Sequence, residues 1–289
     1  MNKNQKTSNR LYGLKKINAG RTAEVFEYSN NKVLKLYRTT FPKKAIEEEF
    51  RIGLSLNKAG LDIAQTYEMV EFEGALGIIF EYIDGASMLQ DLAKRPWLIF
   101  SYSKQMAKSH WKIHKAHLIA HEIPSLKESL IDKILRAPLL TTKEKGIIVS
   151  HLLALKDRRA ICHGDFHPDN IIISKNGLVT VDWITARVGN SMADVARTWL
   201  LLTMGTLPEK KSGIEVFLAK YLRNAFYHSY IREYKKLSKI SDAAFEDWKL
   251  PVAAARLLEN VSEQENQHLL NFIRSKLSKT ENVVERGKK

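Results

Sequence analysis

Alternating apolar and polar positions dominate the first 83 residues, with one helical stretch among them. The period of two predicts four β-strands, over residues 23–28, 32–38, 67–72 and 75–83. The turn Ser29-Asn30-Asn31 joins the first two strands, and Glu73-Gly74 joins the last two as a hairpin. Apolar side chains spaced four apart, followed by Gly60, predict a helix over 44–58. The chain is therefore expected to begin with a small antiparallel sheet and one helix.

From residue 88 onward the apolar pattern becomes mainly helical. Residues 88–158 are expected to form helices, with loops near Pro96, Pro124 and Pro138. A strand–loop–strand segment is predicted over 160–183, with a turn at Asn176-Gly177, and the remainder is expected to be helical. The expected fold class is therefore α+β. It consists of a sheet-containing domain over 1–83 and a larger helical domain over 84–289, with a ligand between them.

The composition excludes several classes of protein. The chain has 289 residues, 44% of them hydrophobic, which is typical of a globular protein. Its single cysteine, Cys162, rules out an intramolecular disulfide and a four-cysteine zinc site. No apolar run approaches the ~18 residues of a membrane span, and residues 1–16 do not resemble a signal peptide. We expect a soluble, cytoplasmic protein without a membrane partner, and the oligomeric state stays open.

The net charge of +14 favours anionic partners, with nucleotides among them. Many of the positive charges lie in residues 1–44, where a solvated basic surface is the ordinary explanation. No recognition-helix, RNA-binding or zinc-finger pattern accompanies them, so a nucleic-acid partner is not expected. A nucleic-acid-binding protein remains the third alternative, which a steep salt dependence of binding would support.

Three oxygen-bearing side chains mark the segment that carries the chemistry. Asp165 and Asn170 lie five residues apart in a loop between two apolar strands, and Asp182 follows the next strand in Val181-Asp182-Trp183. Phosphoryl transfer needs such a set, because one carboxylate orients the attacking hydroxyl and hard oxygen ligands hold Mg²⁺ on the phosphates. A polar hairpin with Asx turns is the alternative explanation.

The same residues resemble the aminoglycoside phosphotransferase and choline kinase superfamily, which has a protein-kinase-like bilobal fold. The family motif His-Gly-Asp-x-His-x-x-Asn, followed by Ile/Val-Asp-Trp, matches residues 163–170 and 181–183. The resemblance extends over about residues 15–270. It implies that Asp165 is the catalytic carboxylate and that Asn170 and Asp182 are the metal ligands.

The resemblance also gives supporting roles to histidines of the loop and to a later aspartate. His163 belongs to the motif, and His167 falls where protein kinases often have a lysine that faces the transferred phosphate; a histidine there can instead brace the loop. Asp194 is expected to brace the catalytic loop from a helix N-terminus. An ion pair between Asp194 and Arg197 on that helix is a compatible alternative.

The nucleotide contacts are expected in the first domain. Lys35, inside an apolar strand, needs a counter-charge, which Glu49 or, as second choice, Glu48 would supply; an edge strand facing solvent is the ordinary alternative. By resemblance, this pair would hold the lysine against the phosphates. The turn at Gly20 would cover the phosphates, and the backbone of Glu81 and Ile83 would bind the adenine.

A stripe of histidines at positions 110, 114, 117 and 121 falls on one helical face. Histidines four residues apart can bind zinc. No His-Glu-x-x-His arrangement and no nearby thiolate accompany them, so packing against the core or solvation is the better explanation.

Three departures from protein kinases favour a small acceptor. Asp182 and Asp194 lie only twelve residues apart, Gly164 stands where an arginine would bind a phosphorylated activation loop, and Trp183 is followed by Ile184 instead of glycine. Two groups of acidic residues could face a cationic acceptor, although solvated helix faces are commoner and the net charge disfavours polycations. They are Asp242, Glu246 and Asp247, and Glu259, Glu263 and Glu265.

The sequence therefore predicts an enzyme that moves the γ-phosphoryl group of ATP or GTP to a hydroxyl of an unidentified small molecule, with Mg²⁺ as cofactor. The main alternative is a nucleotide-binding scaffold that has lost catalysis, and the presence of every expected catalytic residue argues against it. Protein kinase activity is less favoured, for the three reasons above.

Overall fold

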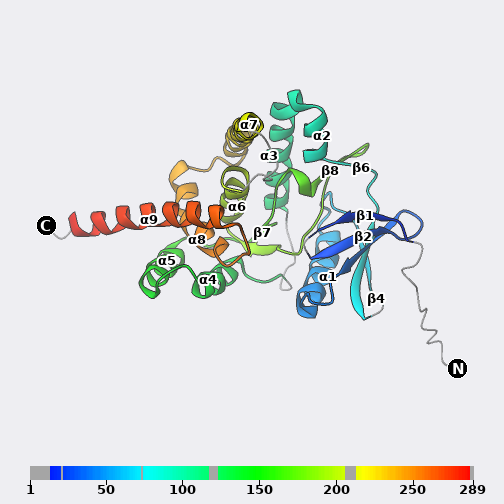
Figure 1. Ribbon diagram of the computed structural model, residues 1–289, viewed down its shortest axis with the longest axis horizontal. Coiled ribbons are helices and arrows are strands. Elements are labelled where there is room, and N and C mark those ends of the chain that lie inside the picture. Colours follow the sequence, from blue (N-terminus) through cyan, green and yellow to red (C-terminus); the bar gives the residue numbers. More distant parts are fainter. Residues whose placement is uncertain (1–13, 21, 73, 117–122, 206–212, 287–289) are drawn as a thin grey trace. The chain divides into compact units, whose positions relative to one another are not determined.

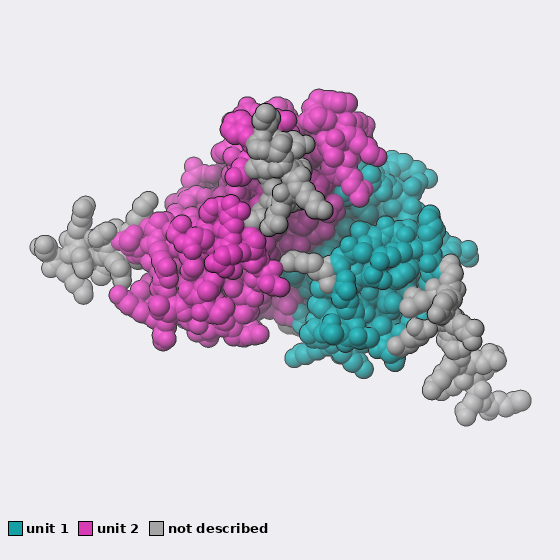
Figure 2. Space-filling view, viewed as in Figure 1, with its two compact units in different colours: residues 1–87, 118–122, 171–185 teal, residues 88–117, 123–170, 186–289 magenta. Residues whose placement is uncertain are grey.

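The computed structural model describes residues 14–20, 22–72, 74–116, 123–205 and 213–286. They form two compact units, which Figure 2 colours separately. The first unit comprises 1–87, 118–122 and 171–185, and the second comprises 88–117, 123–170 and 186–289. The chain thus returns to the first unit after the loop at 163–170, because the hairpin that follows this loop belongs to that unit.

A five-stranded antiparallel sheet forms most of the first unit, in the order β1-β2-β3-β5-β4 (Figure 1). The four predicted strands and the predicted helix are all confirmed. The strand β1, which pairs with β2, was not expected. The elements are β1 (Lys16–Ala19), β2 (Ala23–Glu27), β3 (Lys32–Tyr37), α1 (Lys43–Lys58), β4 (Thr66–Phe72) and β5 (Ala75–Glu81).

The alternation in β3 sorts its side chains between two apolar clusters. Leu34 and Leu36 pack with Phe72 and Ile79 on one face of the sheet. On the other face, Tyr37 packs in a second cluster that includes Ile46 of α1. Because side chains two residues apart share a face, Lys35 lies on the same side of the sheet as α1. This placement brings its ammonium within reach of the helix.

The rest of the first unit is a three-stranded sheet in the order β6-β8-β9. It consists of β6 (Gly85–Ser87), which was not predicted, and the expected hairpin of β8 (Ile171–Ser174) and β9 (Gly177–Thr180). The Thr180 amide donates to the Asp62 carbonyl at 2.9 Å. This bond ties the end of β9 to the connection between α1 and β4, two residues before Asp182.

The second unit is mainly helical, as predicted. It also holds two paired strands, and the second of them corrects the expectation that everything after residue 183 is helical. Its elements are α2 (Met88–Lys94), α3 (Ile99–Lys115), α4 (Leu126–Arg136), α5 (Thr142–Ala154), β7 (Ala160–Cys162), β10 (Arg187–Gly189), α6 (Ser191–Thr203), α7 (Gly213–Ser238), α8 (Asp242–Arg256) and α9 (Glu263–Arg286). Short 3₁₀ turns, Pro96–Leu98 and Pro168–Asn170, precede α3 and β8.

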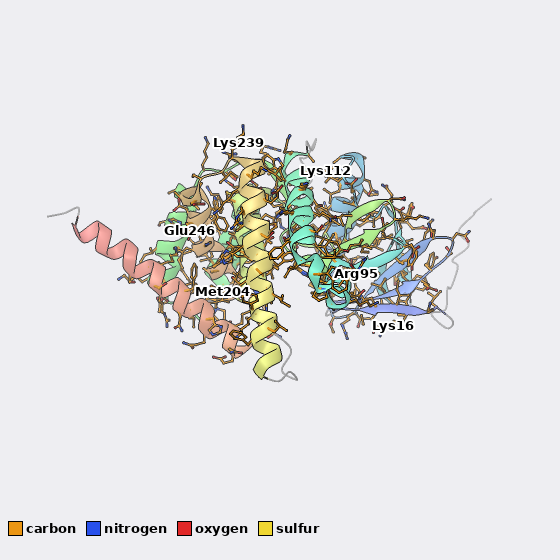
Figure 3. All side chains as sticks on the ribbon, turned by 90° about the horizontal axis from the view of Figure 1, so that it is seen from above. Lys16, Arg95, Lys112, Met204, Lys239 and Glu246 are labelled. Atoms are coloured by element: carbon orange, nitrogen blue, oxygen red, sulfur yellow. The ribbon has the colours of Figure 1, made fainter. Side chains whose placement is uncertain are left out.

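The long helices α3 and α7 pack along each other, and α6 packs on α8 (Figure 3). Their facing side chains include the fully buried Met106 and Tyr230. The antiparallel sheet near the N-terminus and the larger helical part give the protein the expected α+β, kinase-like fold. In the described part of the chain, no helix has both the length and the apolar character needed to cross a membrane.

Candidate active site

Lys35 and two carboxylates form the charged centre of the first unit. The Lys35 ammonium Nζ lies 2.7 Å from Glu49 Oε1 and 2.8 Å from Asp182 Oδ1. The predicted ion pair with Glu49 is present, so Glu49 and not Glu48 is the partner from α1. The edge-strand alternative is wrong, because β3 lies between β2 and β5 in the middle of the sheet.

Burial shapes the protonation of this group. Burial alone would lower the pKa of Lys35, but the nearby charges of Glu49 and Asp182 raise it well above its usual value. Tyr37 donates a hydrogen bond of 2.5 Å from its hydroxyl to Glu49 Oε2, the other oxygen of that carboxylate. Lys35 is thus held as a cation by one buried carboxylate and one that is 42% exposed, that of Asp182.

Asp182 adopts a left-handed backbone conformation, with φ of 64°. Such a conformation costs about 1 kcal/mol for a residue with a side chain, although aspartate tolerates it better than most. The Trp183 indole Nε1 donates to the Thr180 carbonyl at 3.2 Å, which fixes the turn around Asp182. The turn presents the Asp182 carboxylate to Lys35 on one side and to solvent on the other.

In the second unit, the loop 163–170 gathers its polar groups around Asp165. Asn170 Nδ2 donates to the Asp165 carbonyl at 2.9 Å and lies 3.4 Å from its Oδ2. His167 Nδ1 accepts from the Asp169 amide at 3.3 Å, so its protonated nitrogen is Nε2, which lies 3.4 Å from Asp165 Oδ2. His167 therefore faces the Asp165 carboxylate, and Asn170 lies beside the same residue.

Asp165 is kept ionised by its neighbours. Burial would raise the pKa of its carboxyl, but the hydrogen bond from His167 and the charge of Arg197 lower it below its usual value. Its side chain is 31% exposed, and Arg197 Nη2 lies 3.7 Å from Oδ1. An ionised, partly exposed carboxylate can accept a hydrogen bond, and later a proton, from a hydroxyl group.

Asp194, at the start of α6, holds the backbone of this loop. Its two oxygens accept the amides of His163, at 2.6 Å, and of Gly164, at 2.8 Å. Gly164 has a φ of 79°, a conformation that glycine adopts readily. His163, fully buried, contributes further by accepting the Asp165 amide at 3.2 Å on Nδ1. The predicted bracing contact is therefore present.

The alternative ion pair between Asp194 and Arg197 is not formed. Arg197 instead donates from its Nε to the Gly164 carbonyl at 3.1 Å. Its Nη2 binds Glu259 Oε2 at 2.9 Å. The three-residue spacing on α6 would allow Arg197 to pair with Asp194. Two histidines, however, already form hydrogen bonds with the Asp194 carboxylate.

His110 and His114 are those histidines. Their Nε2 atoms lie 3.0 and 3.2 Å from Asp194 Oδ2, and their Nδ1 atoms lie 2.6 Å from the hydroxyls of Tyr230 and Tyr234, respectively. Because an ionised carboxylate only accepts hydrogen bonds, each imidazole donates to Asp194 from Nε2, and each Nδ1 is paired with a tyrosine hydroxyl. We call these five side chains the histidine network.

The contacts of the histidine network bear on whether the histidine stripe forms a metal site. The ligating atoms of His110, His114 and Asp194 lie within 4.8 Å of one another, as metal ligands would. Each of these atoms already has a hydrogen-bond partner inside the protein, so the group is satisfied without an ion. Packing of one or two histidines against the core was the expected outcome. His117 and His121 lie outside the described residues.

The histidine network should make the fold sensitive to acid. Burial lowers the pKa of His110 to about 3 from 6.5. Between these pH values the unfolded chain binds a proton that the folded chain does not, so the free energy of unfolding should fall by about 1.4 kcal/mol per pH unit as pH decreases. Urea unfolding of the wild type and of His110→Gln at several pH values measures this slope.

The variant His110→Gln should show a shallower dependence on pH, since it lacks the buried proton acceptor. His268→Gln, which changes an exposed histidine of α9, should keep the wild-type slope. Equal slopes for the wild type and His110→Gln would contradict the neutral state of the buried ring.

The remaining predicted nucleotide contacts lie in the first unit. The Gly20 amide donates to the Ala23 carbonyl at 2.8 Å, which closes the turn between β1 and β2. The Glu81 amide donates to the Gln65 carbonyl at 2.9 Å, and Ile83 follows two residues after the end of β5. The roles of these three residues toward a nucleotide stay predictions.

Sequence reasoning missed Arg197 as a neighbour of Asp165, and it missed three tyrosines. Tyr37 could have been found, because it shares a face of β3 with Lys35. Tyr230 and Tyr234 repeat on α7 the four-residue spacing of His110 and His114 on α3, which is the signal that the sequence offers. Pairing the two helices, however, required their packing.

A model of the phosphotransferase enzyme family matches residues 13–237. Since this match spans most of the chain, the protein belongs to that family. The family and the similar solved structures are small-molecule phosphotransferases. Among curated proteins, no sequence matches the chain.

Solved structures with a similar fold include a kinase and an aminoglycoside phosphotransferase. The amicoumacin kinase hAmiN, in complex with AMP-PNP, Ca²⁺ and Ami, has a TM-score of 0.58 at 14% identity over 92% of this chain and 88% of that one. An aminoglycoside-3′-phosphotransferase of type VIII has a TM-score of 0.59 at 13% identity, over 84% and 94%.

A choline kinase from Cryptosporidium parvum Iowa II has a TM-score of 0.53 at 13% identity, over 95% of this chain and 90% of that one. At these identities the likeness concerns the fold, and it confirms the expected kinase-like architecture.

Proposed function

We propose that the protein transfers the γ-phosphoryl group of ATP or GTP to a hydroxyl of a small molecule. The observation that carries this proposal is the state of Asp165. It is ionised, partly exposed, and fixed by Asn170, by His167 and, through the loop backbone, by Asp194. Family membership and the fold of small-molecule kinases support the same activity.

In the proposed reaction, Asp165 orients the acceptor hydroxyl toward the γ-phosphorus. The oxygen–phosphorus bond to the acceptor forms as the bond to the bridging oxygen of the nucleotide breaks, and the hydroxyl proton moves to the Asp165 carboxylate late in the step. The pKa of Asp165, held below its usual value, keeps the carboxylate free of a proton before this step. His167 lies beside Asp165 and would donate a hydrogen bond to the transferred phosphoryl group.

The two predicted metal ligands carry the donor atoms that suit a magnesium ion. Asp182 offers a carboxylate and Asn170 an amide oxygen, since its Nδ2 group is used in the bond to the Asp165 carbonyl. Hard oxygen ligands of this kind suit Mg²⁺, which would neutralise charge that develops on the phosphates. Lys35, fixed by Glu49, would contact the α- and β-phosphates, and its ammonium would exchange part of its pairing with Asp182 for them.

Nucleotide binding gives the first test. Mg·ATP or Mg·GTP at about 100 times its dissociation constant should stabilise the fold by about 2.7 kcal/mol, which raises Tm by about 5 °C. Lys35→Met should abolish this shift, because it removes the cation that meets the phosphates. The measurement is thermal unfolding with nucleotide, with and without Mg²⁺.

Lys32→Met is the matched control, since it makes the same change three residues earlier in β3. Lys32 lies over the ring of Tyr67, at 4.5 Å from its centroid, and takes no part in the group around Glu49. A Tm shift in Lys35→Met as large as in Lys32→Met would contradict the role of Lys35. A screen of hydroxylated metabolites and antibiotics for acceptor-dependent nucleotide consumption then identifies the substrate.

A further inference from the structure

A cluster of charged residues adjoins Asp165 in the second unit. Arg197 joins the two: its Nε donates to the Gly164 carbonyl at 3.1 Å, and its Nη2 lies 3.7 Å from Asp165 Oδ1. From there the charges continue over five other elements or connections. We call these residues the basic cluster: Lys133 of α4, Arg187 of β10, Arg197 of α6, Arg256 of α8, Glu259 after α8 and Glu265 of α9.

The two carboxylates of the basic cluster are already neutralised. Glu259 Oε2 accepts from Arg197 at 2.9 Å and also from Arg256, and its Oε1 lies 3.8 Å from Lys133. Glu265 is buried and binds Arg256 Nε at 2.9 Å. Two of the three acidic residues in this group, Glu259 and Glu265, are therefore committed to arginines.

Two of the three residues in the other acidic group are occupied in the same way. Asp242 pairs with Lys235, and Glu246 pairs with Lys249 and Lys276. A cationic acceptor would have to displace a lysine or an arginine to reach any of these four carboxylates. Such an exchange gives little net attraction, because each departing cation loses its own ion pair.

Positive charge exceeds negative charge in the basic cluster, with four cations against two carboxylates, or three when the adjoining Asp165 is counted. The excess of positive charge affects the pKa of Lys133. Burial lowers the pKa of its ammonium, and the charges of Arg197, Arg187 and Arg256 lower it further against the opposing effect of Glu259. Its side chain is still 36% exposed, and the oxygen it faces in Glu259 is at the long distance of 3.8 Å. Lys133 is thus a cation that an incoming anion could reach.

We propose that the acceptor is a hydroxylated small molecule that carries a carboxylate or phosphate group, and that the basic cluster binds this group beside Asp165. The inference rests on the proposed function and assigns the class of its substrate. Arginine and lysine recognise both kinds of anion through charge-assisted hydrogen bonds. The anion would take up the excess positive charge while the hydroxyl meets Asp165.

Four matched sugars test the charge of the acceptor. The protein is saturated with AMP-PNP and Mg²⁺, so that anions cannot enter the nucleotide site. Binding of glucuronate, glucose 6-phosphate, glucose and glucosamine is then measured by thermal unfolding and tryptophan fluorescence at constant ionic strength. We expect at least one of the two anionic sugars to bind, and the comparison between them distinguishes a preference for carboxylate from one for phosphate. Glucose and glucosamine should bind at least tenfold more weakly.

The variant Lys133→Gln tests whether the anionic group binds in the basic cluster. It should weaken binding of the anionic sugar about tenfold, the effect of one lost charge-assisted hydrogen bond. Lys108→Gln, which removes the same charge from an exposed site on α3, should bind like the wild type. Binding of neither anionic sugar, equal or tighter binding of glucosamine, or unchanged binding in Lys133→Gln would each overturn the inference.

The outcome is separable from that of the proposed function. A protein that binds Mg·AMP-PNP but fails any of these criteria loses only the assignment of an anionic acceptor. Turnover of a cationic alcohol that depends on Asp165 would likewise overturn the assignment and leave the kinase activity standing. Failure to bind nucleotide at all would instead reject the proposed function itself.

Discussion

Asp165→Asn should lower turnover on the order of 10³-fold while nucleotide binding stays unchanged. The variant keeps the shape of the side chain but loses the charge that orients the hydroxyl and takes its proton, a contribution typical of a general base. Nucleotide binding should persist because Lys35 and Glu49, which are expected to meet the phosphates, are unaltered. Acceptor-dependent release of ADP and the Tm shift with Mg·AMP-PNP measure the two quantities.

Asp169→Asn is the matched control for this variant. It makes the same change four residues later in the same loop, at an exposed side chain, and should keep wild-type turnover. Wild-type turnover in Asp165→Asn would reject its assignment as the catalytic carboxylate. An equal loss in both variants would point to damage of the loop as a whole.

Asp194→Ala should destabilise the fold by about 3–5 kcal/mol, the usual cost of removing one partner from a buried charged group. The change leaves the amides of His163 and Gly164, and the Nε2 donors of His110 and His114, without an acceptor. Asp194→Asn should lie between wild type and Asp194→Ala, since one oxygen remains. Urea unfolding monitored by tryptophan fluorescence gives these values.

The same measurement on Asp132→Asn provides the comparison. Asp132 pairs with Arg136 on the surface of α4, and both side chains are well exposed, so its loss should cost less than about 1 kcal/mol. If Asp194→Ala were no less stable than Asp132→Asn, the hydrogen bonds around Asp194 would not hold the loop as described.

The period of apolar residues was enough to predict the long elements. The strands around Lys35 and the helix carrying Glu49 follow from alternation and from a four-residue repeat. The elements that escaped prediction, β1, β6 and β10, have only three or four residues each, too few to display a period. Their formation depends on neighbouring strands, which offer hydrogen-bond partners that no local pattern reveals.

The candidate site was predictable where its residues are close in sequence. Asp165 and Asn170 lie in one loop, and the charge requirement of Lys35 led to a glutamate on the following helix. The contacts of Asp194 were harder, because Tyr230 is 120 residues away from His110 and only the packing of α3 on α7 joins them. Arg197 was misassigned for a similar reason, since helical spacing could not reveal that Glu259 lies beside it.

The residues of the histidine network and those of the basic cluster differ in how freely they can be substituted. The backbone of the loop around Asp165 is fixed by side chains that do not meet solvent. The charges of the basic cluster, by contrast, take no part in that support apart from Arg197. Under the proposed function, substitutions at positions 133 and 187 could therefore change the acceptor, while the loop around Asp165 keeps its geometry.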